Sequence, residues 1–194
     1  MKVYGDSRSG NCLKVRYISE YLRLPFHWEE IDVLSGYTRT PEFLSINPAG
    51  QIPTVVLQDG RVLAQSNAIL RYLGRGTALI PEDPYNEAKM DEWLFWEQYS
   101  HEPAIAVVRF LVALKGVPRA DVDQQLIEKG DKALDLMEKA LGSGDYLVGD
   151  SLSLADIALL AYTQFAEEGG FSLESRPRVR GWISRVQANL ASGA

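Results

Sequence analysis

The residues best suited to chemistry are Ser9 and Asn11, in the segment Ser9-Gly10-Asn11-Cys12 at the start of a predicted helix. A serine hydroxyl cannot take part in thiol–disulfide exchange, but it can donate a hydrogen bond to a thiolate that a ligand supplies. The unpaired N–H groups and partial positive charge of a helix N-terminus favour the same anion. Because a helix N-terminus also lowers the pKa of a thiol from its ordinary value of about 8.5, this segment can hold a thiolate at neutral pH.

Each of these residues also has a plain structural interpretation. Ser9 can be the N-cap of the helix, and the loop alone favours neither role. Asn11 can likewise be a local cap of the helix. Cys12, at helical spacing with Val15 and Ile18, is predicted to be a buried apolar residue rather than a reactive thiol.

The predicted elements around this segment have the order of a thioredoxin-like domain. We expect β-α-β, an irregular stretch and then β-β-α, with the first two strands parallel because a helix connects them. Asp59-Gly60 separates the two later strands as a two-residue turn, for which both residues need positive φ. Ser66 is predicted to cap the last helix. The elements are predicted over residues 2–4, 11–22, 26–31, 54–57, 61–64 and 67–73.

In such a domain the chemistry-bearing segments gather around one edge of the sheet. Ser9 stands where a thioredoxin-like redox protein carries the first cysteine of Cys-x-x-Cys. Pro53 precedes a strand and is predicted to be cis, which turns the backbone N–H and C=O of Ile52 toward a peptide ligand. Ser66 can bind a carboxylate through its hydroxyl and backbone N–H, although taken alone it is an ordinary N-cap. A thiol site, an extended-backbone site and a carboxylate site together fit a thiol-bearing acidic peptide.

The rest of the chain is predicted to be helical. Residues 74–86, rich in glycine and proline, are expected to form a linker. Ser153 and Asp156 have the spacing of a capping box at the start of a helix. The other helices are predicted over 86–114, with a kink at Pro103, over 120–141 and over 177–190. The expected fold is therefore an α/β thioredoxin-like N-terminal domain over 1–76 and an all-α helical-bundle C-terminal domain over 86–194.

The composition narrows the classes of function. The 194 residues are 46% hydrophobic and 24% charged, which is typical of a globular protein. The net charge of −6 argues against a nucleic-acid partner, and no apolar run has the length that a membrane span needs. A single cysteine suits a reducing compartment, so we expect a cytoplasmic protein. Two histidines, with no phosphate loop and no nucleophile elbow, argue against a metal site and against hydrolase, kinase or dehydrogenase chemistry.

Three motifs carry a resemblance to a known family. They are Asn47-Pro48-x-Gly50-x-Ile52-Pro53, Gln65-Ser66-x-Ala68-Ile69-x-x-Tyr72-Leu73 and Ser153-x-Ala155-Asp156. In their order and spacing the chain resembles the glutathione transferases over nearly its whole length. The resemblance implies glutathione as co-substrate on the N-terminal domain, an acceptor pocket facing the helical domain, and a homodimer. The chain departs from many members in having Gly10 instead of proline and Gln65 instead of glutamate.

The resemblance also implies which residues hold the sulfur. Ser9 would donate a hydrogen bond to the glutathione sulfur, and Asn11 is a second candidate, as in bacterial members with Ser/Thr-x-Asn. No tyrosine lies in the loop, which disfavours the tyrosine-type mechanism, and Tyr4 is expected on the strand beside the pocket. Residues that either border the acceptor pocket or belong to the helix core are Trp96, His101 and Arg109.

The remaining contacts to glutathione follow by position in the same way. The backbone of Ile52, next to a cis Pro53, would pair with the cysteinyl backbone. Gln65 and Ser66 would hold the γ-glutamyl end. Gln51 would reach toward the glycyl end.

The expected function is that of an enzyme that binds glutathione, stabilises its thiolate and lets it attack a small electrophile, without a covalent enzyme intermediate. The Ser9-x-Asn11 pair leaves an alternative, a glutathione-dependent disulfide reductase or peroxidase. Another alternative is a non-catalytic binding protein that has kept the fold. The expected partners are thus glutathione and a small electrophilic or disulfide substrate, with no nucleic acid and no membrane.

Overall fold

The computed structural model describes residues 1–142 and 144–193. Contacts within the chain divide it into two units. Unit 1 is Met1–Arg75 with the C-terminal residues from Leu190 on, and unit 2 is Gly76–Asn189. Each unit has its own layers and is described by itself.

The centre of unit 1 is a sheet with the strand order β2-β1-β3-β4. Strands β1 (Lys2–Gly5) and β2 (His27–Glu30) are parallel, with Val3 opposite Trp28. Strands β3 (Thr54–Val56) and β4 (Val62–Ala64) continue the sheet in antiparallel pairs. The helices of the unit are α1 (Gly10–Tyr21), the 3₁₀ turn η1 (Tyr37–Arg39), α2 (Pro41–Ile46) and α3 (Ser66–Leu73).

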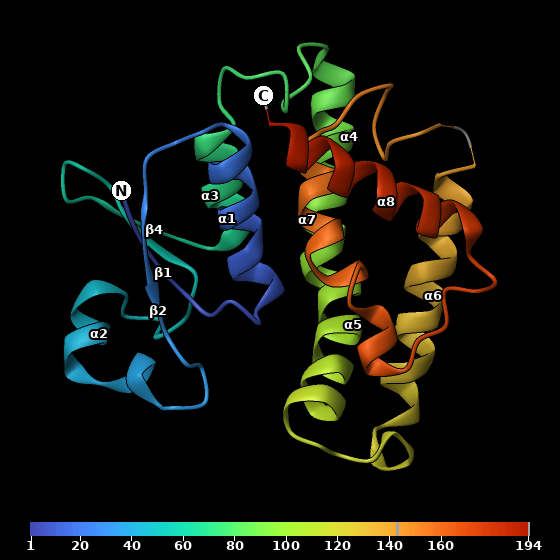
Figure 1. Ribbon diagram of the computed structural model, residues 1–194, viewed down its shortest axis with the longest axis horizontal. Coiled ribbons are helices and arrows are strands. Elements are labelled where there is room, and N and C mark those ends of the chain that lie inside the picture. The colour runs from blue at the N-terminus through green and yellow to red at the C-terminus, as the bar shows by residue number, and fades with distance from the viewer. Residues whose placement is uncertain (143, 194) are drawn as a thin grey trace. The chain divides into compact units, whose positions relative to one another are not determined.

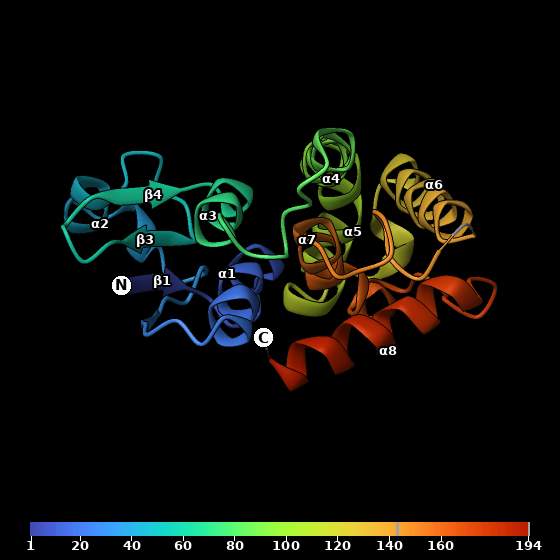
Figure 2. The same ribbon diagram turned by 90° about the horizontal axis from the view of Figure 1, so that it is seen from above.

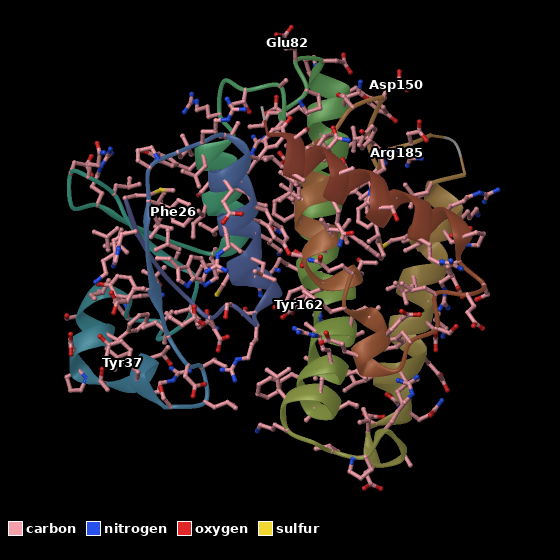
Figure 3. The ribbon with its side chains drawn as sticks, viewed as in Figure 1. Phe26, Tyr37, Glu82, Asp150, Tyr162 and Arg185 are labelled. Atoms are coloured by element: carbon pink, nitrogen blue, oxygen red, sulfur yellow. The ribbon has the colours of Figure 1, made fainter. Side chains whose placement is uncertain are left out.

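Helices cover both faces of this sheet because successive strand residues point to opposite sides. Val3 of β1 packs with Val15 of α1 and Ile69 of α3, and all three are fully buried. The next residue, Tyr4, packs edge-on against Phe43 of α2, with ring centroids 5.8 Å apart. Figure 1 shows α1 and α3 on one side of the strands and α2 on the other, and Figure 2 shows α1 and α3 side by side. Tyr37 on η1 completes the aromatic cluster around Phe43 (Figure 3).

Some details of unit 1 differ from the sequence-based expectations. Tyr4 lies on β1, as expected, and its ring packs in the core against Phe43 of α2. The stretch expected to be irregular contains α2, which Thr40 begins by accepting a hydrogen bond from the backbone N–H of Phe43. The hairpin loop is longer than two residues, since Leu57 bonds to Arg61 and only Gly60 of the turn has a positive φ.

Unit 2 begins with an almost continuous helical segment. It consists of α4 (Pro84–Trp96), the π-helical turn η2 (Glu97–His101), α5 (Glu102–Arg109) and a second π-helical turn, η3 (Phe110–Leu114). A π-helical turn ends two residues before Pro103, the position of the predicted kink, where proline has no N–H to donate. Asp83 starts α4 two residues earlier than predicted, by accepting a hydrogen bond from the N–H of Asn86.

The remaining helices of unit 2 are α6 (Gln124–Ala140), α7 (Leu154–Thr163) and α8 (Pro177–Ser192), with 3₁₀ turns η4 (Arg119–Asp121) and η5 (Ala166–Gly169). Asp123 caps α6, so this helix begins four residues later than predicted. All ten residues of α7 are buried, and α8 crosses α6 and α7 in Figure 1. None of the helices in the described parts of the chain is long and apolar enough to cross a bilayer.

The predicted capping box at the start of α7 is confirmed. One oxygen of the Asp156 carboxylate, Oδ2, accepts hydrogen bonds from the backbone N–H and the hydroxyl of Ser153. The other oxygen, Oδ1, accepts from the N–H of Leu147 and from Nε1 of Trp182 on α8. A single buried carboxylate therefore begins α7 and ties it to α8 and to the preceding loop.

Candidate functional site

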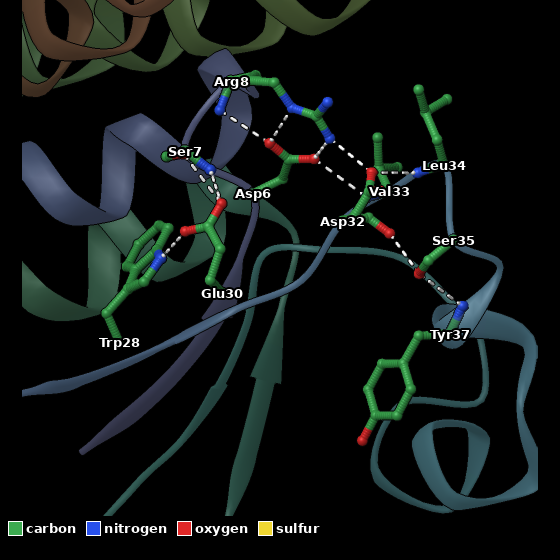
Figure 4. Close-up of polar contacts among 10 residues, drawn as sticks. All are labelled: Asp6, Ser7, Arg8, Trp28, Glu30, Asp32, Val33, Leu34, Ser35 and Tyr37. Atoms are coloured by element: carbon green, nitrogen blue, oxygen red, sulfur yellow. Dashed lines mark hydrogen bonds and ion pairs between the residues drawn. The ribbon is translucent and has the colours of Figure 1, made fainter.

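The loop between β1 and α1, which carries Ser9, is held by the buried carboxylate of Asp6 (Figure 4). Oδ1 accepts from the backbone N–H and from Nε of Arg8, at 2.8 and 3.0 Å. Oδ2 accepts from an Arg8 guanidinium nitrogen at 2.6 Å and from the N–H of Val33 at 3.0 Å. The same guanidinium nitrogen lies 2.6 Å from Asp32, so the loop is anchored to the segment after β2.

A second carboxylate, that of Glu30, holds the residue between Asp6 and Arg8. It accepts hydrogen bonds from the N–H and hydroxyl of Ser7 and from Nε1 of Trp28. Burial raises the pKa of each of these carboxyls, but the hydrogen bonds outweigh burial and lower both pKa values overall. Both groups are therefore ionised at neutral pH and act as fixed anchors for the loop.

Ser9 is the N-cap residue of α1 by its backbone, but its side chain makes no capping hydrogen bond. Its carbonyl oxygen accepts from the N–H groups of Cys12 and Leu13, and the residue is half-buried. Cys12 is fully buried, as predicted, and burial raises the pKa of its thiol to about 11, although hydrogen bonds from the Asp6 backbone and the Ser9 side chain act in the opposite direction. The only cysteine of the chain is thus protonated at pH 7, and the Ser9 hydroxyl lies at the helix N-terminus without serving as its cap.

Asn11 and Ser66, predicted for different ends of the ligand, meet in the structure. The Ser66 hydroxyl on α3 donates to Oδ1 of Asn11 on α1 at 2.9 Å. Nζ of Lys14 donates to the same Oδ1 at 2.9 Å, and it also lies 3.3 Å from the Ser66 hydroxyl and 3.1 Å from Oδ1 of Asn67. Lys14 is fully buried. These contacts join the N-terminal turns of the two helices that cover one face of the sheet.

The residue before α3, Gln65, has a left-handed backbone with φ of 69°, which is unusual for a residue other than glycine. Gln65 is the N-cap residue, so α3 begins at Ser66, one residue earlier than predicted. Ser66 is therefore the first residue of the helix and not its cap. Its N–H is one of the helix-terminal N–H groups that have no acceptor within the helix, which suits an anion.

The segment before β3 is organised by the buried side chain of Asn47. Its Nδ2 donates to the carbonyl of Gln51 and to the Thr54 hydroxyl, and the Thr54 hydroxyl donates to the same carbonyl. The Ile52–Pro53 peptide bond is cis, as predicted. The Ile52 side chain packs in the cluster around Phe43, whereas Gln51 is exposed.

The residues proposed for an acceptor pocket, all in unit 2, have different surroundings. His101 is fully buried, with Nε2 3.0 Å from the Thr163 hydroxyl. The Arg109 guanidinium lies 2.6 Å from Glu168 and stacks on the Phe165 ring. These contacts are those of residues in helix packing. Trp96 instead borders an open pocket of about 370 Å³ between α4 and α6, which Trp93 and Leu136 also line.

Sequence reasoning missed the groups that hold the predicted site residues. Asp6 and Arg8 have opposite charges and lie two positions apart in the loop, and this spacing is the one local signal of their ion pair. Lys14 follows Asn11 by one helical turn, a spacing that brings two side chains together. Glu30 carries no local signal, because it contacts Ser7 across 23 positions of the sequence. Across residues 1–142 and 144–193, no three His, Cys, Asp or Glu side chains are grouped so as to hold a metal ion.

Known proteins resemble this chain over both units. A family model described as the glutathione S-transferase N-terminal domain matches residues 8–75, and one described as the C-terminal domain matches residues 96–189. Glutathione S-transferase 3 of Zea mays is 33% identical over 203 residues, covering 98% of this chain and 90% of the relative. A glutathione S-transferase crystal structure from Pseudomonas fluorescens is 48% identical, with a TM-score of 0.93 over 96% of this chain and 94% of that one. The fold is also that of Ure2p in complex with glutathione, at a TM-score of 0.87 and 21% identity over 100% of this chain and 97% of that one.

These likenesses agree with the architecture of the two units. The thioredoxin-like sheet of unit 1 and the helices of unit 2 are the fold predicted from the motifs, and that prediction is confirmed. The predicted family is confirmed as well, since both domain models match in the expected order. The chain therefore belongs to the glutathione S-transferase family.

Proposed function

We propose that this protein is a glutathione transferase that binds glutathione on unit 1 and holds its thiolate beside Ser9 and Asn11. The observation that carries the proposal is the Ser9 hydroxyl, which lies at the N-terminus of α1 and makes no capping bond. Asp6 and Glu30 anchor Arg8 and Ser7, the two residues just before Ser9, which fixes the loop that presents the hydroxyl. Membership of the family supports glutathione as the co-substrate.

The energetics of such a site are sufficient for catalysis at neutral pH. A hydrogen bond to a charged group is worth about 1.5–3 kcal/mol, and one unit of pKa corresponds to about 1.4 kcal/mol. One bond from Ser9, together with the positive end of α1, therefore lowers the thiol pKa from about 8.5 to below 7. The bound thiolate would then attack an electrophile held next to it, with proximity supplying the rest of the acceleration.

We propose that the segments before β3 and α3 make the other contacts to glutathione. The backbone of Ile52, beside cis Pro53, would pair with the cysteinyl residue, and exposed Gln51 would reach the glycyl end. Exposed Gln65 and the backbone N–H of Ser66 would hold the γ-glutamyl end. Because the Ser66 hydroxyl already donates to Asn11, we assign the carboxylate to the helix-terminal N–H first and to the hydroxyl second.

The domain limits and the location are proposed with this function. Residues 1–76 would form the glutathione-binding domain, and residues 86–194 would form the helical domain that supplies the acceptor pocket. Because a chain with a single cysteine forms no intramolecular disulfide, it needs no oxidising compartment, and we propose a cytoplasmic location.

Two assays on one preparation test the proposal. Conjugation of glutathione to a generic aryl halide measures transferase activity, and reduction of a glutathione-capped disulfide measures the reductase alternative. The proposal expects conjugation by the unchanged protein and a loss of at least about ten-fold in Ser9→Ala, since one charge-assisted bond is removed. Ser151→Ala, at an exposed position of unit 2 outside the proposed site, is a matched control that should leave both activities unchanged. A protein that binds glutathione and is inactive in both assays is a binding protein, which would contradict the proposal.

The reductase alternative has one observation in its favour, the presence of two neutral side chains, Ser9 and Asn11, at the same helix N-terminus. If Asn11 orients a second sulfur, Asn11→Ala reduces disulfide reduction and spares aryl-halide conjugation. Equal losses in the two assays leave the plain transferase function standing. The two activities should be measured at one pH on both variants.

We also propose a homodimer that forms through the helical unit. The open pocket lined by Trp93, Trp96 and Leu136 lies on α4 and α6, and the same helical segment exposes 76% of Phe95 and 88% of Tyr99. An exposed group of large aromatic residues is typical of an interface between chains. Sedimentation velocity should give a dimer for the unchanged protein and a monomer for Phe95→Glu. A monomer at micromolar concentration before any substitution would contradict this part of the proposal.

A further inference from the structure

We propose that Lys14 is a positioning residue that sets the orientation of the Asn11 amide, so that the amide N–H faces the thiol site. The inference rests on the proposed function, because it concerns the site assigned there to the glutathione sulfur. It adds to that site a residue which makes no contact with the ligand and acts through Asn11.

The geometry around the Asn11 oxygen carries the inference. Oδ1 accepts two hydrogen bonds of 2.9 Å, one from Nζ of Lys14 and one from the Ser66 hydroxyl. Lys14 is fully buried, and its ammonium also contacts Asn67. A buried ammonium with several neutral oxygen acceptors is held firmly, since each lost bond would leave a desolvated charge.

The chemistry of the two donors shows which of them decides the orientation. A serine hydroxyl can donate or accept, so Ser66 alone would tolerate either end of the Asn11 amide. A lysine ammonium can only donate. If the amide were flipped, its NH₂ group would face the Lys14 ammonium, which would replace a charge-assisted bond with a repulsive contact. Lys14 therefore holds the amide oxygen on the buried side.

The consequence appears at the opposite end of the amide. With Oδ1 turned toward Lys14 and Ser66, Nδ2 is the opposite end of the planar amide, and we assign it as a donor to a sulfur at the N-terminus of α1. A positive donor on Oδ1 also polarises the amide and strengthens its N–H as a donor, because hydrogen bonds in a chain reinforce one another. A flipped Asn11 would instead present its oxygen to the thiolate and destabilise it.

A double-mutant cycle tests this inference. The four proteins are the unchanged chain, Lys14→Met, Asn11→Ala and the double variant, and the readout is the pKa of bound glutathione from thiolate absorbance, alongside the affinity from calorimetry. Methionine is an unbranched side chain one atom shorter than lysine, and it has no donors. If Lys14 acts through Asn11, Lys14→Met raises the thiol pKa by about one unit in the unchanged background and leaves it unaltered in the Asn11→Ala background.

The controls separate the inference from the proposed function. Lys2→Met removes a partly exposed lysine of the same unit and should leave the thiol pKa unchanged. If Lys14→Met does not fold, the cycle is run with Lys14→Gln, for which a smaller rise is expected because glutamine can offer either a donor or an acceptor. The inference is overturned, and the transferase function stands, if Lys14→Met does not raise the thiol pKa. It is overturned likewise if Lys14→Met raises the thiol pKa equally in the unchanged and Asn11→Ala backgrounds, because the Lys14 charge would then act directly on the thiolate. An unchanged protein that fails to bind glutathione overturns the proposed function, and the inference with it.

Discussion

The Ser66 hydroxyl donates a hydrogen bond of 2.9 Å to Oδ1 of Asn11, although the two residues are 55 positions apart in the sequence. The residue proposed for the carboxylate of glutathione thus touches a residue proposed for its sulfur. A substitution of Ser66 can therefore alter the position of Asn11, and the reverse. The affinity for glutathione and the pKa of its bound thiol have to be measured separately for each variant.

For Ser66→Ala we expect weaker glutathione binding with little change in turnover. The contact to a remote carboxylate is alike in the ground state and the transition state, so its loss raises KM for glutathione and not the barrier of the chemical step. Lys14 still holds Asn11 in this variant. Steady-state kinetics should show KM raised by less than about ten-fold and kcat reduced less than about two-fold, because the variant keeps the backbone N–H to which the carboxylate is first assigned. A fall in kcat at fixed KM would show that the assignment of Ser66 is wrong.

Ser9→Ala should have the opposite effect. We expect glutathione to bind within about five-fold of the unchanged protein, while the pKa of its bound thiol rises by about one to two units, the equivalent of one charge-assisted hydrogen bond. Turnover at pH 7 should fall by about ten-fold or more and recover as the pH is raised through the new pKa, because the thiolate then forms without Ser9. Absorbance titration of bound glutathione measures the shift. An unaltered thiol pKa would remove Ser9 from the mechanism.

Asp6→Asn should loosen the loop that carries Ser9 and destabilise the protein. Three donors from Arg8 and the N–H of Val33 would face a neutral group, so we expect a loss of about 2 kcal/mol in the free energy of unfolding at pH 7. The folded-state pKa of Asp6 lies below its ordinary value, so this stabilisation is present above pH 3.8 and is lost as the pH falls through the folded pKa. Urea unfolding should therefore show the two proteins converging in acid.

The control for this experiment is Asp32→Asn, which removes the exposed carboxylate on the other side of Arg8. We expect a change below about 1 kcal/mol, because solvent screens this pair. If the two variants lose equal stability at pH 7, the anchoring role of Asp6 is not supported.

Asp156→Ala should destabilise unit 2 without altering the glutathione site. The substitution leaves four donors without their acceptor, those of Leu147, of Trp182 and two of Ser153, and we expect a loss of about 3 kcal/mol or more. The control is Asp150→Ala, at an exposed position before α7, which should change the free energy of unfolding by less than about 0.5 kcal/mol. Calorimetric titration below the unfolding temperature should give an unchanged Kd for glutathione, and a large change in Kd would contradict this separation.

Features that depend on neighbours along the chain could be read from the sequence. The short strand β1, the helical spacing of α1 and the capping box of Ser153 and Asp156 all arise within a few residues, where local backbone geometry decides the outcome. The order of these elements and the motifs around Pro53 and Ser66 were enough to predict the fold and the family. The short helix α2 was not predicted, because six residues give little periodic signal and its start depends on the capping hydrogen bond of Thr40.

Only the tertiary structure decided how the proposed site residues are held. Whether Ser9 caps α1 or keeps its hydroxyl for another role depends on the loop geometry that Asp6 and Glu30 impose, and Glu30 reaches Ser7 from another strand. The contacts of Lys14 and Asn11 with Ser66 likewise require α1 and α3 to lie side by side on the sheet. A sequence pattern records which side chains share a helix or strand face, but a hydrogen bond between two elements depends on their packing, and packing is a property of the folded chain as a whole.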